Sequence, residues 1–144
     1  MILDILTHPN PLLRQRAEFV RSVDASLHTL LKNMHETMVE YVGVGLAAPQ
    51  VGVLQRILVV QYKERKLSLI NPEITFQEGM EVANEGCLSL PNYRLDVPRA
   101  AHIVVKAKNK LGQSIVLKEK NMVARIIQHE MDHLNGILIL DYEK

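Results

Sequence analysis

Two histidines four residues apart, His129 and His133, are the residues of this sequence best suited to chemistry. Side chains at this spacing project from one face of a helix, one turn apart, so the two imidazoles could bind one metal ion. Glu130 follows the first histidine, where a carboxylate can take a proton from a water at the metal. The pattern predicts metal-assisted hydrolysis of an amide-like bond, although so short a string also arises by chance.

Two histidines leave a metal short of ligands, because catalytic zinc-type sites use three protein ligands and keep one position open. The single cysteine, Cys87, is the candidate for the third ligand, since a thiolate binds zinc or ferrous iron strongly. Gly86 beside it permits close approach of another backbone. Taken alone, a free thiol is more often a buried structural cysteine.

A third segment, residues 43–50, holds two glycines and two alanines and ends in Gln50. Small side chains allow a second backbone to approach this segment, and Gln50 adds a side-chain donor. The alternative is an ordinary helix-ending turn that leads into a strand.

Length and composition bound the class of protein. The chain has 144 residues and is 47% apolar and 23% charged, which is typical of one globular domain. Its 17 basic and 16 acidic residues nearly cancel, which gives no sign of a nucleic-acid or membrane surface. The lone cysteine favours a reducing compartment. There is no apolar run of ~20 residues and no charged leader before Pro9, so we expect a cytoplasmic protein.

Periodicity predicts the elements that position these residues. A first helix begins with Asp24 as N-cap and ends at Gly43, with an apolar stripe in which Met34 and Met38 belong to the core. A second helix carries Met122, Ile126, His129 and His133 on one face. Strands between the helices indicate an α+β fold. The expected ranges are strands 56–60 and 67–70 (ended by Asn71-Pro72), a hairpin of 101–107 and 114–118, and a helix 122–134 with Asn121 as N-cap and Gly136 past its end.

The three segments together, 43–50, 85–89 and 128–133, resemble the motifs of the peptide deformylase family in the same order and at similar distances. The resemblance extends over residues 8–14 and 94–99. It implies a single catalytic domain, 1–144, in which antiparallel sheets pack around the helix with the HExxH motif. Longer family members dock at the ribosome through a further C-terminal helix. The sequence ends at Lys144, so it resembles the compact form without that helix.

The resemblance also implies the chemistry and the residues that perform it. A divalent metal, usually Fe²⁺ with Zn²⁺, Ni²⁺ or Co²⁺ as alternatives, assists hydrolysis of the formyl group from the N-terminal formylmethionine of new polypeptides, and formate is released. The implied metal ligands are Cys87, His129 and His133, the general base and acid is Glu130, and the oxyanion donors are Gln50 and the backbone N–H of Leu88. The implied substrate contacts are Val44, Gly45, Gly86, Arg94, Met122 and Ile126.

Two rival functions remain open from the residues. One is a general HExxH metalloprotease, against which the cysteine ligand and small size argue. The other is a module in which a metal only stabilises the fold, but such sites usually have four protein ligands, and Glu130 favours chemistry. The expected partner is a formylated nascent peptide, with the ribosome as a further candidate and neither DNA nor a membrane expected. The sequence does not choose the native metal, the oligomeric state or the peptide preference beyond the first residue.

Overall fold

Two helices and seven strands make up the computed structural model, which describes residues 1–144. The α+β class is confirmed. Neither helix is long and apolar enough to cross a membrane. The elements are α1 (Ala25–Glu40), β1 (Gly45–Ala47), β2 (Ile57–Tyr62), β3 (Arg65–Glu78), β4 (Glu81–Cys87), β5 (Leu90–Arg99), β6 (His102–Lys108), β7 (Ser114–Lys120) and α2 (Asn121–Leu134), with short 3-10 helices at Pro11–Arg14, Ala48–Val51 and Ile139–Tyr142.

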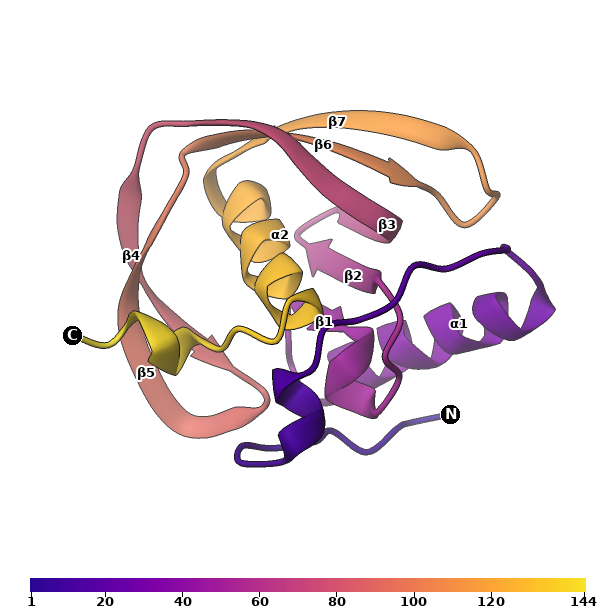
Figure 1. Ribbon diagram of the computed structural model, residues 1–144, viewed down its shortest axis with the longest axis horizontal. Coiled ribbons are helices and arrows are strands. Elements are labelled where there is room, and N and C mark those ends of the chain that lie inside the picture. Colours follow the sequence, from indigo (N-terminus) through magenta and orange to yellow (C-terminus); the bar gives the residue numbers. More distant parts are fainter.

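The strands form two antiparallel sheets that surround α2. One sheet has the order β1-β2-β3-β6-β7, and the other consists of β4 and β5. In Figure 1, β3, β6 and β7 arch over α2, and β4 and β5 continue along its side. Strand β2 is buried on both faces: Leu58 and Val60 pack in the core with α2, while Ile57 and Val59 pack in the core with α1. The central strands thereby fix α2 on one side and α1 on the other.

Helix α1 begins as predicted and ends differently. The Asp24 carboxylate accepts a hydrogen bond from the Leu27 N–H at 3.0 Å, and both Met34 and Met38 are fully buried. The predicted stop at Gly43 is wrong, because the left-handed residue that ends the helix is Val42, with φ 58°. Gly43 follows it and donates to the Met38 carbonyl. A Cβ at Gly43 would meet Cδ1 of Leu88 at 2.9 Å, so a larger residue here would displace the Leu88 side chain.

The predicted end of a strand at Asn71-Pro72 is also wrong. Strand β3 continues to Glu78 through a register shift between Ile70 and Glu73. Asn71 adopts φ 52°, and its amide exchanges two 2.8 Å hydrogen bonds with the backbone of Val20. These two bonds anchor the bulge, where the regular pairing with β6 is interrupted, so the strand passes the proline and then pairs with β6 again.

The hairpin and the second helix lie where they were predicted. Strands β6 and β7 pair in full register from His102↔Lys120 to Lys108↔Ser114. Helix α2 starts at Asn121, so the predicted N-cap is wrong by one residue: β7 runs directly into the helix and the extended Lys120 takes the cap position. Gly136 follows the helix with φ 74°, as predicted.

Candidate metal centre and active site

Cys87, His129 and His133 converge although 42 residues separate the cysteine from the first histidine. Cys87 ends β4, and the side chains of Cys87 and Glu85 on this strand reach His133 and His129 of α2. Their ligand atoms all lie within 4.8 Å of one another, with Sγ of Cys87 3.3 Å from Nε2 of His133. The two imidazoles are buried, and the thiol is half-buried. One soft sulfur and two imidazole nitrogens in this arrangement could hold a zinc or ferrous ion.

A buried carboxylate orients the first histidine. Oε1 of Glu85 lies 2.8 Å from Nδ1 of His129, which leaves Nε2 as the ring nitrogen available to a metal. Arg99 donates to both oxygens of Glu85 at 2.9 Å, and Arg125 donates to Oε2 at 2.5 Å. Burial raises the pKa of Glu85, but the hydrogen bonds from Arg99 and His129 outweigh it and lower this pKa to about 2. Glu85 is therefore ionised at neutral pH.

The electrostatics of the three-residue cluster suit a cation. Burial opposes a charge on His129, but Glu130, Cys87 and Glu85 outweigh it and raise the pKa of this histidine to about 10. The cluster therefore stabilises positive charge. Burial lowers the pKa of His133 well below its ordinary value, and so holds this imidazole in the neutral form that binds metals. Nε2 of His133 faces the cysteine sulfur, and Oε1 of Glu130 is buried without a hydrogen-bond partner. These features fit a metal and its associated water.

Glu130 lies next to the cluster and is 4% exposed. Burial raises its pKa to about 7, with other carboxylates adding to this shift and the charges of His129 and Arg99 opposing it. A carboxyl group with this pKa can both accept and donate a proton near neutral pH. A Cβ at Gly45 would lie 2.6 Å from Oε2 of Glu130 and 2.7 Å from Ile126, so only glycine leaves the carboxylate its position.

Besides Glu130, the side-chain amide of Gln50 is a polar group close to the Cys87 thiol. It lies in the 3-10 helix Ala48–Val51 and is 1% exposed. Its Oε1 accepts from the Ala47 N–H at 2.9 Å, so Nε2 is directed to Oγ of Ser89 at 3.1 Å and towards Sγ of Cys87 at 3.7 Å. This amide can donate to an oxygen that develops negative charge in front of the cysteine.

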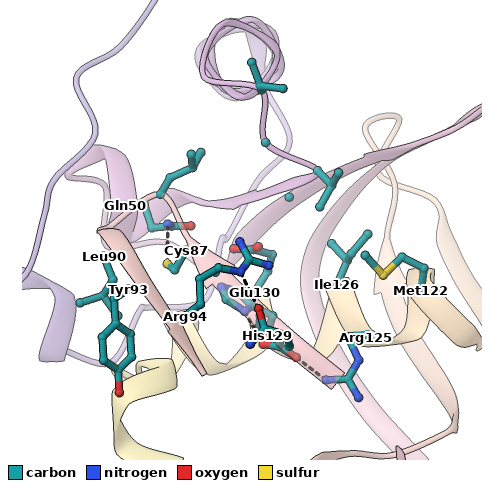
Figure 2. Close-up of a pocket in the computed structure, with 18 of the residues that line it drawn as sticks. Gln50, Cys87, Leu90, Tyr93, Arg94, Met122, Arg125, Ile126, His129 and Glu130 are labelled. Atoms are coloured by element: carbon teal, nitrogen blue, oxygen red, sulfur yellow. Dashed lines mark hydrogen bonds and ion pairs between the residues drawn. The ribbon is translucent and has the colours of Figure 1, made fainter. Parts of the chain in front are cut away.

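A pocket of about 500 Å³ opens onto these groups, and the predicted site residues come together on its walls. Figure 2 shows Met122 and Ile126 side by side on α2, at the end of the pocket away from Tyr93 and Leu90. Arg94 extends across the pocket from β5 and donates to Asn84. The predicted residues that line the pocket are Val44, Gly45, Gln50, Gly86, Cys87, Leu88, Arg94, Met122, Ile126, His129 and Glu130. His133 is the predicted site residue that lies behind this lining.

Sequence reasoning missed the charged groups behind the histidines. Glu85 is in the same short motif as Cys87, and the alternation of a β-strand places the two side chains on the same face. Arg125 lies one helical turn before His129 and also donates to the Val97 carbonyl. Arg99 has no local signal, because it reaches Glu85 only through the pairing of β4 with β5.

Comparisons with known proteins agree with this geometry. Residues 2–144 match the family model described as polypeptide deformylase. The chain is 43% identical to a peptide deformylase of Thermodesulfovibrio yellowstonii, with 97% of this chain and 88% of the relative covered. It is 47% identical to peptide deformylase 1 of Bacillus cereus, with 95% and 89% covered.

Solved structures give the same result. The peptide deformylase of Thermotoga maritima superposes with a TM-score of 0.96 at 42% identity, covering 98% of this chain and 97% of that one. A probable peptide deformylase from Synechococcus phage S-SSM7 superposes with a TM-score of 0.94 at 39% identity, covering 97% and 99%.

The fold and the cluster on α2 are those of a metal-dependent hydrolase. With the matches along its whole length, the chain belongs to the peptide deformylase family. It is an enzyme that removes the formyl group from the N-terminal formylmethionine of newly made polypeptides and releases formate. The antiparallel sheets packed around the HExxH helix are confirmed.

Proposed function

We propose that Cys87, His129 and His133 hold the catalytic metal and that Glu130 is the group that moves protons in deformylation. The observation that carries this assignment is the convergence of three ligand atoms within 4.8 Å beside a buried carboxylate oxygen that has no partner. A bound divalent cation supplies Lewis acidity, which polarises the formyl carbonyl and makes water more acidic. The three ligands leave room for water and substrate, as catalytic sites require.

We assign ferrous iron as the native metal. A thiolate and two neutral imidazoles suit Fe²⁺, and the same donors accept Zn²⁺, Ni²⁺ or Co²⁺. Ligand type sets affinity but not cellular supply, so metal analysis of protein purified without oxygen decides among these ions.

In the proposed mechanism, Glu130 transfers protons and Gln50 stabilises negative charge. Glu130 accepts a proton from the attacking water, and the resulting oxygen nucleophile adds to the formyl carbon. The Gln50 amide and the backbone N–H of Leu88 donate to the formyl oxygen as its negative charge grows. Glu130 then returns the proton to the leaving amine when the C–N bond breaks, so the products are formate and a free N-terminus. Burial, which raises the pKa of Glu130, favours a carboxyl group that can take up and return a proton.

The substrate peptide binds in extended form between β1 and β4. Strand β1 is the edge of its sheet, and β4 pairs only with β5, so both present free backbone groups to the pocket. Val44, Gly45 and Gly86 supply this backbone, and Arg94 contacts the peptide from the rim. Met122 and Ile126 form the apolar pocket for the methionine side chain.

The whole of residues 1–144 acts as one catalytic domain. Its partner is a formylated nascent peptide. We expect the reaction to take place in the cytoplasm, close to the ribosome where such peptides are made.

The direct test is Glu130→Gln. We expect the variant to keep its metal and its unfolding temperature while kcat for formate release falls roughly 10²- to 10⁴-fold, because general acid–base catalysis contributes that much. Formate release at the wild-type rate would refute the assigned role. A control assay on an unformylated internal peptide separates deformylation from general proteolysis, since only the formylated substrate should react.

A further inference from the structure

The outer face of the β6–β7 hairpin is strongly basic. Residues 102–120 contain five lysines and one glutamate, a formal charge of +4, while the other 125 residues carry −3. The near-neutral total of +1 therefore hides a segregation of charge, and the sequence-based expectation of no nucleic-acid surface considered only the total.

Four of the lysines point to one side of the sheet. Lys106, Lys108, Lys118 and Lys120 are exposed, and none of their ammonium groups makes an ion pair or a hydrogen bond within the chain. The opposite face holds the buried residues Ile103, Val105 and Ala107 of the core around α2. Glu119 also points inward, where Arg65 donates to both of its oxygens at 3.1 and 2.7 Å, so it does not neutralise the lysines.

Protection of a sheet edge explains only part of this pattern. Strand β7 is an edge, and lysines on edge strands prevent unwanted strand pairing. This accounts for Lys118 and Lys120. It does not account for Lys106 and Lys108, because β6 is paired on both sides, with β3 and β7. Lys106 lies opposite the exposed Glu73 of β3, which offsets part of its charge, whereas Lys108 lies opposite the apolar Ile70. A charged face that extends over an interior strand is suited to a polyanion.

We propose that this β6–β7 lysine face docks the phosphate backbone of double-helical RNA. Unpaired lysines bind phosphates by releasing condensed counterions, and such contacts position a protein without reading sequence. Single-stranded RNA would call for aromatic side chains on which bases stack. Phe76, 52% exposed, lies beside Val104 at the margin of the face, and β6 and β7 carry no Phe, Tyr or Trp. The one aromatic ring on the face itself is the exposed imidazole of His102 at the start of β6, so the face offers no row of rings on which successive bases could stack. Recognition by shape and backbone contacts is the mode typical of double-helical RNA.

The lysine face adjoins the active site. Lys118 and Lys120 line a hollow of about 850 Å³ that also includes Tyr62 and Lys63 at the β2–β3 turn. Met122 belongs both to this hollow and to the active-site pocket. Figure 1 shows β6 and β7 on the outside of the arch, with α2 beneath them. An RNA surface docked here would therefore lie near the pocket that receives the nascent peptide, a consequence that rests on the proposed function.

The test compares two triple variants of equal charge change. The first is Lys106→Gln with Lys108→Gln and Lys118→Gln. The control is Arg21→Gln with Lys32→Gln and Lys144→Gln, whose side chains are exposed and lie outside the β6–β7 hairpin. The probe is an RNA hairpin with a stem of about 16 base pairs, the length that known double-strand binders span, and binding is measured by fluorescence anisotropy.

The expected result is a steep dependence on salt. With four phosphate contacts, the affinity of the wild type should fall about 50- to 150-fold between about 50 and 200 mM salt. The first variant should lower the slope of log K against log salt by about 2 to 3, and the control should bind like the wild type. Absence of RNA binding by the wild type at low salt, an equal loss in the control, or binding only to phosphatidylserine vesicles would overturn the proposal.

A second readout separates this proposal from the catalytic one. Formate release from a short formylmethionyl tripeptide should be the same in the wild type and both variants, because none of these residues lines the active-site pocket. A wild type that binds RNA but releases no formate would refute the proposed catalytic roles while supporting the lysine face.

Discussion

The substitution Gly45→Ala adds a single methyl group and should strongly lower the rate of deformylation. The added Cβ would lie 2.6 Å from Oε2 of Glu130 and 2.7 Å from Cγ2 of Ile126. Ordinary contact distances are 3.4–4 Å, so the carboxylate must move by about 1 Å or the helix must shift. A displacement of about 1 Å at a reacting group can lower the rate about 10²-fold, or ~2.7 kcal/mol of barrier. Overpacking of this kind also costs about 1–3 kcal/mol of stability.

The assay is formate release with kcat and KM determined separately, together with thermal unfolding and metal content. Gly86→Ala is the matched control, because its added Cβ would meet Nη1 of Arg94 at the same 2.6 Å. Arg94 is exposed and flexible, so it can move away, and we expect a change in KM and little change in kcat. Neither glycine has a positive φ, so backbone strain does not confuse the comparison. Wild-type kcat/KM in Gly45→Ala would refute the position assigned to Glu130.

Gln50, Cys87 and His35 offer three more tests. Gln50→Ala should lower kcat about 10²- to 10³-fold, the usual effect of losing an oxyanion donor, and an unchanged kcat would remove Gln50 from the mechanism. Peroxide treatment that oxidises Cys87 to the sulfinic acid should release the metal and abolish activity, whereas oxidised protein with full metal content would exclude the thiolate as a ligand. Burial, with the charges of Lys66 and Lys110, lowers the pKa of His35 from 6.5 to about 4. As the pH falls from 6.5 to 4, the unfolded chain therefore binds a proton at this residue before the folded chain does. The free energy of unfolding then drops by up to about 3 kcal/mol. In His35→Gln, the free energy of unfolding measured by denaturant titration should fall less over this pH range. The same pH dependence in the variant and the wild type would contradict the role given to His35.

Local patterns in the sequence were sufficient to predict that both helices exist and to predict much of the site, but not the end of α1 or the N-cap of α2. The 3.6-residue period of α2 places Met122, Ile126 and His129 on one face, and the pocket contains all three. Asp24 is the N-cap of α1, as expected for a short polar residue that precedes an apolar stripe. These features depend on neighbours in the chain, so the sequence determines them directly.

Features that depend on contacts between distant segments could not be predicted in this way. The course of β3 beyond Pro72 depends on the bond of Asn71 to Val20, 51 residues away. Pairing of β4 with β5 brings Arg99 to Glu85. The alternation of Tyr93, Leu95 and Val97 with polar residues marks β5 as a strand, but no such pattern marks β4, and nothing local indicates that the two strands pair. The ion network behind His129 was missed for the same reason.

The net charge of the chain does not indicate how the charged residues are distributed over the fold. A balance of 17 basic and 16 acidic residues gives no sign of a polyanion partner. Only the register of β6 with β7 shows that Lys106, Lys108, Lys118 and Lys120 share one face of the sheet.

All the catalytic assignments depend on one sulfur and two imidazole nitrogens holding a single cation. X-ray absorption at the metal edge, on protein purified without oxygen, tests this coordination most directly. We predict one divalent metal per chain with one sulfur and two nitrogen neighbours, and loss of the sulfur neighbour in Cys87→Ser. A fully active protein whose metal has no sulfur neighbour, or whose metal remains unchanged in Cys87→Ser, would contradict these assignments.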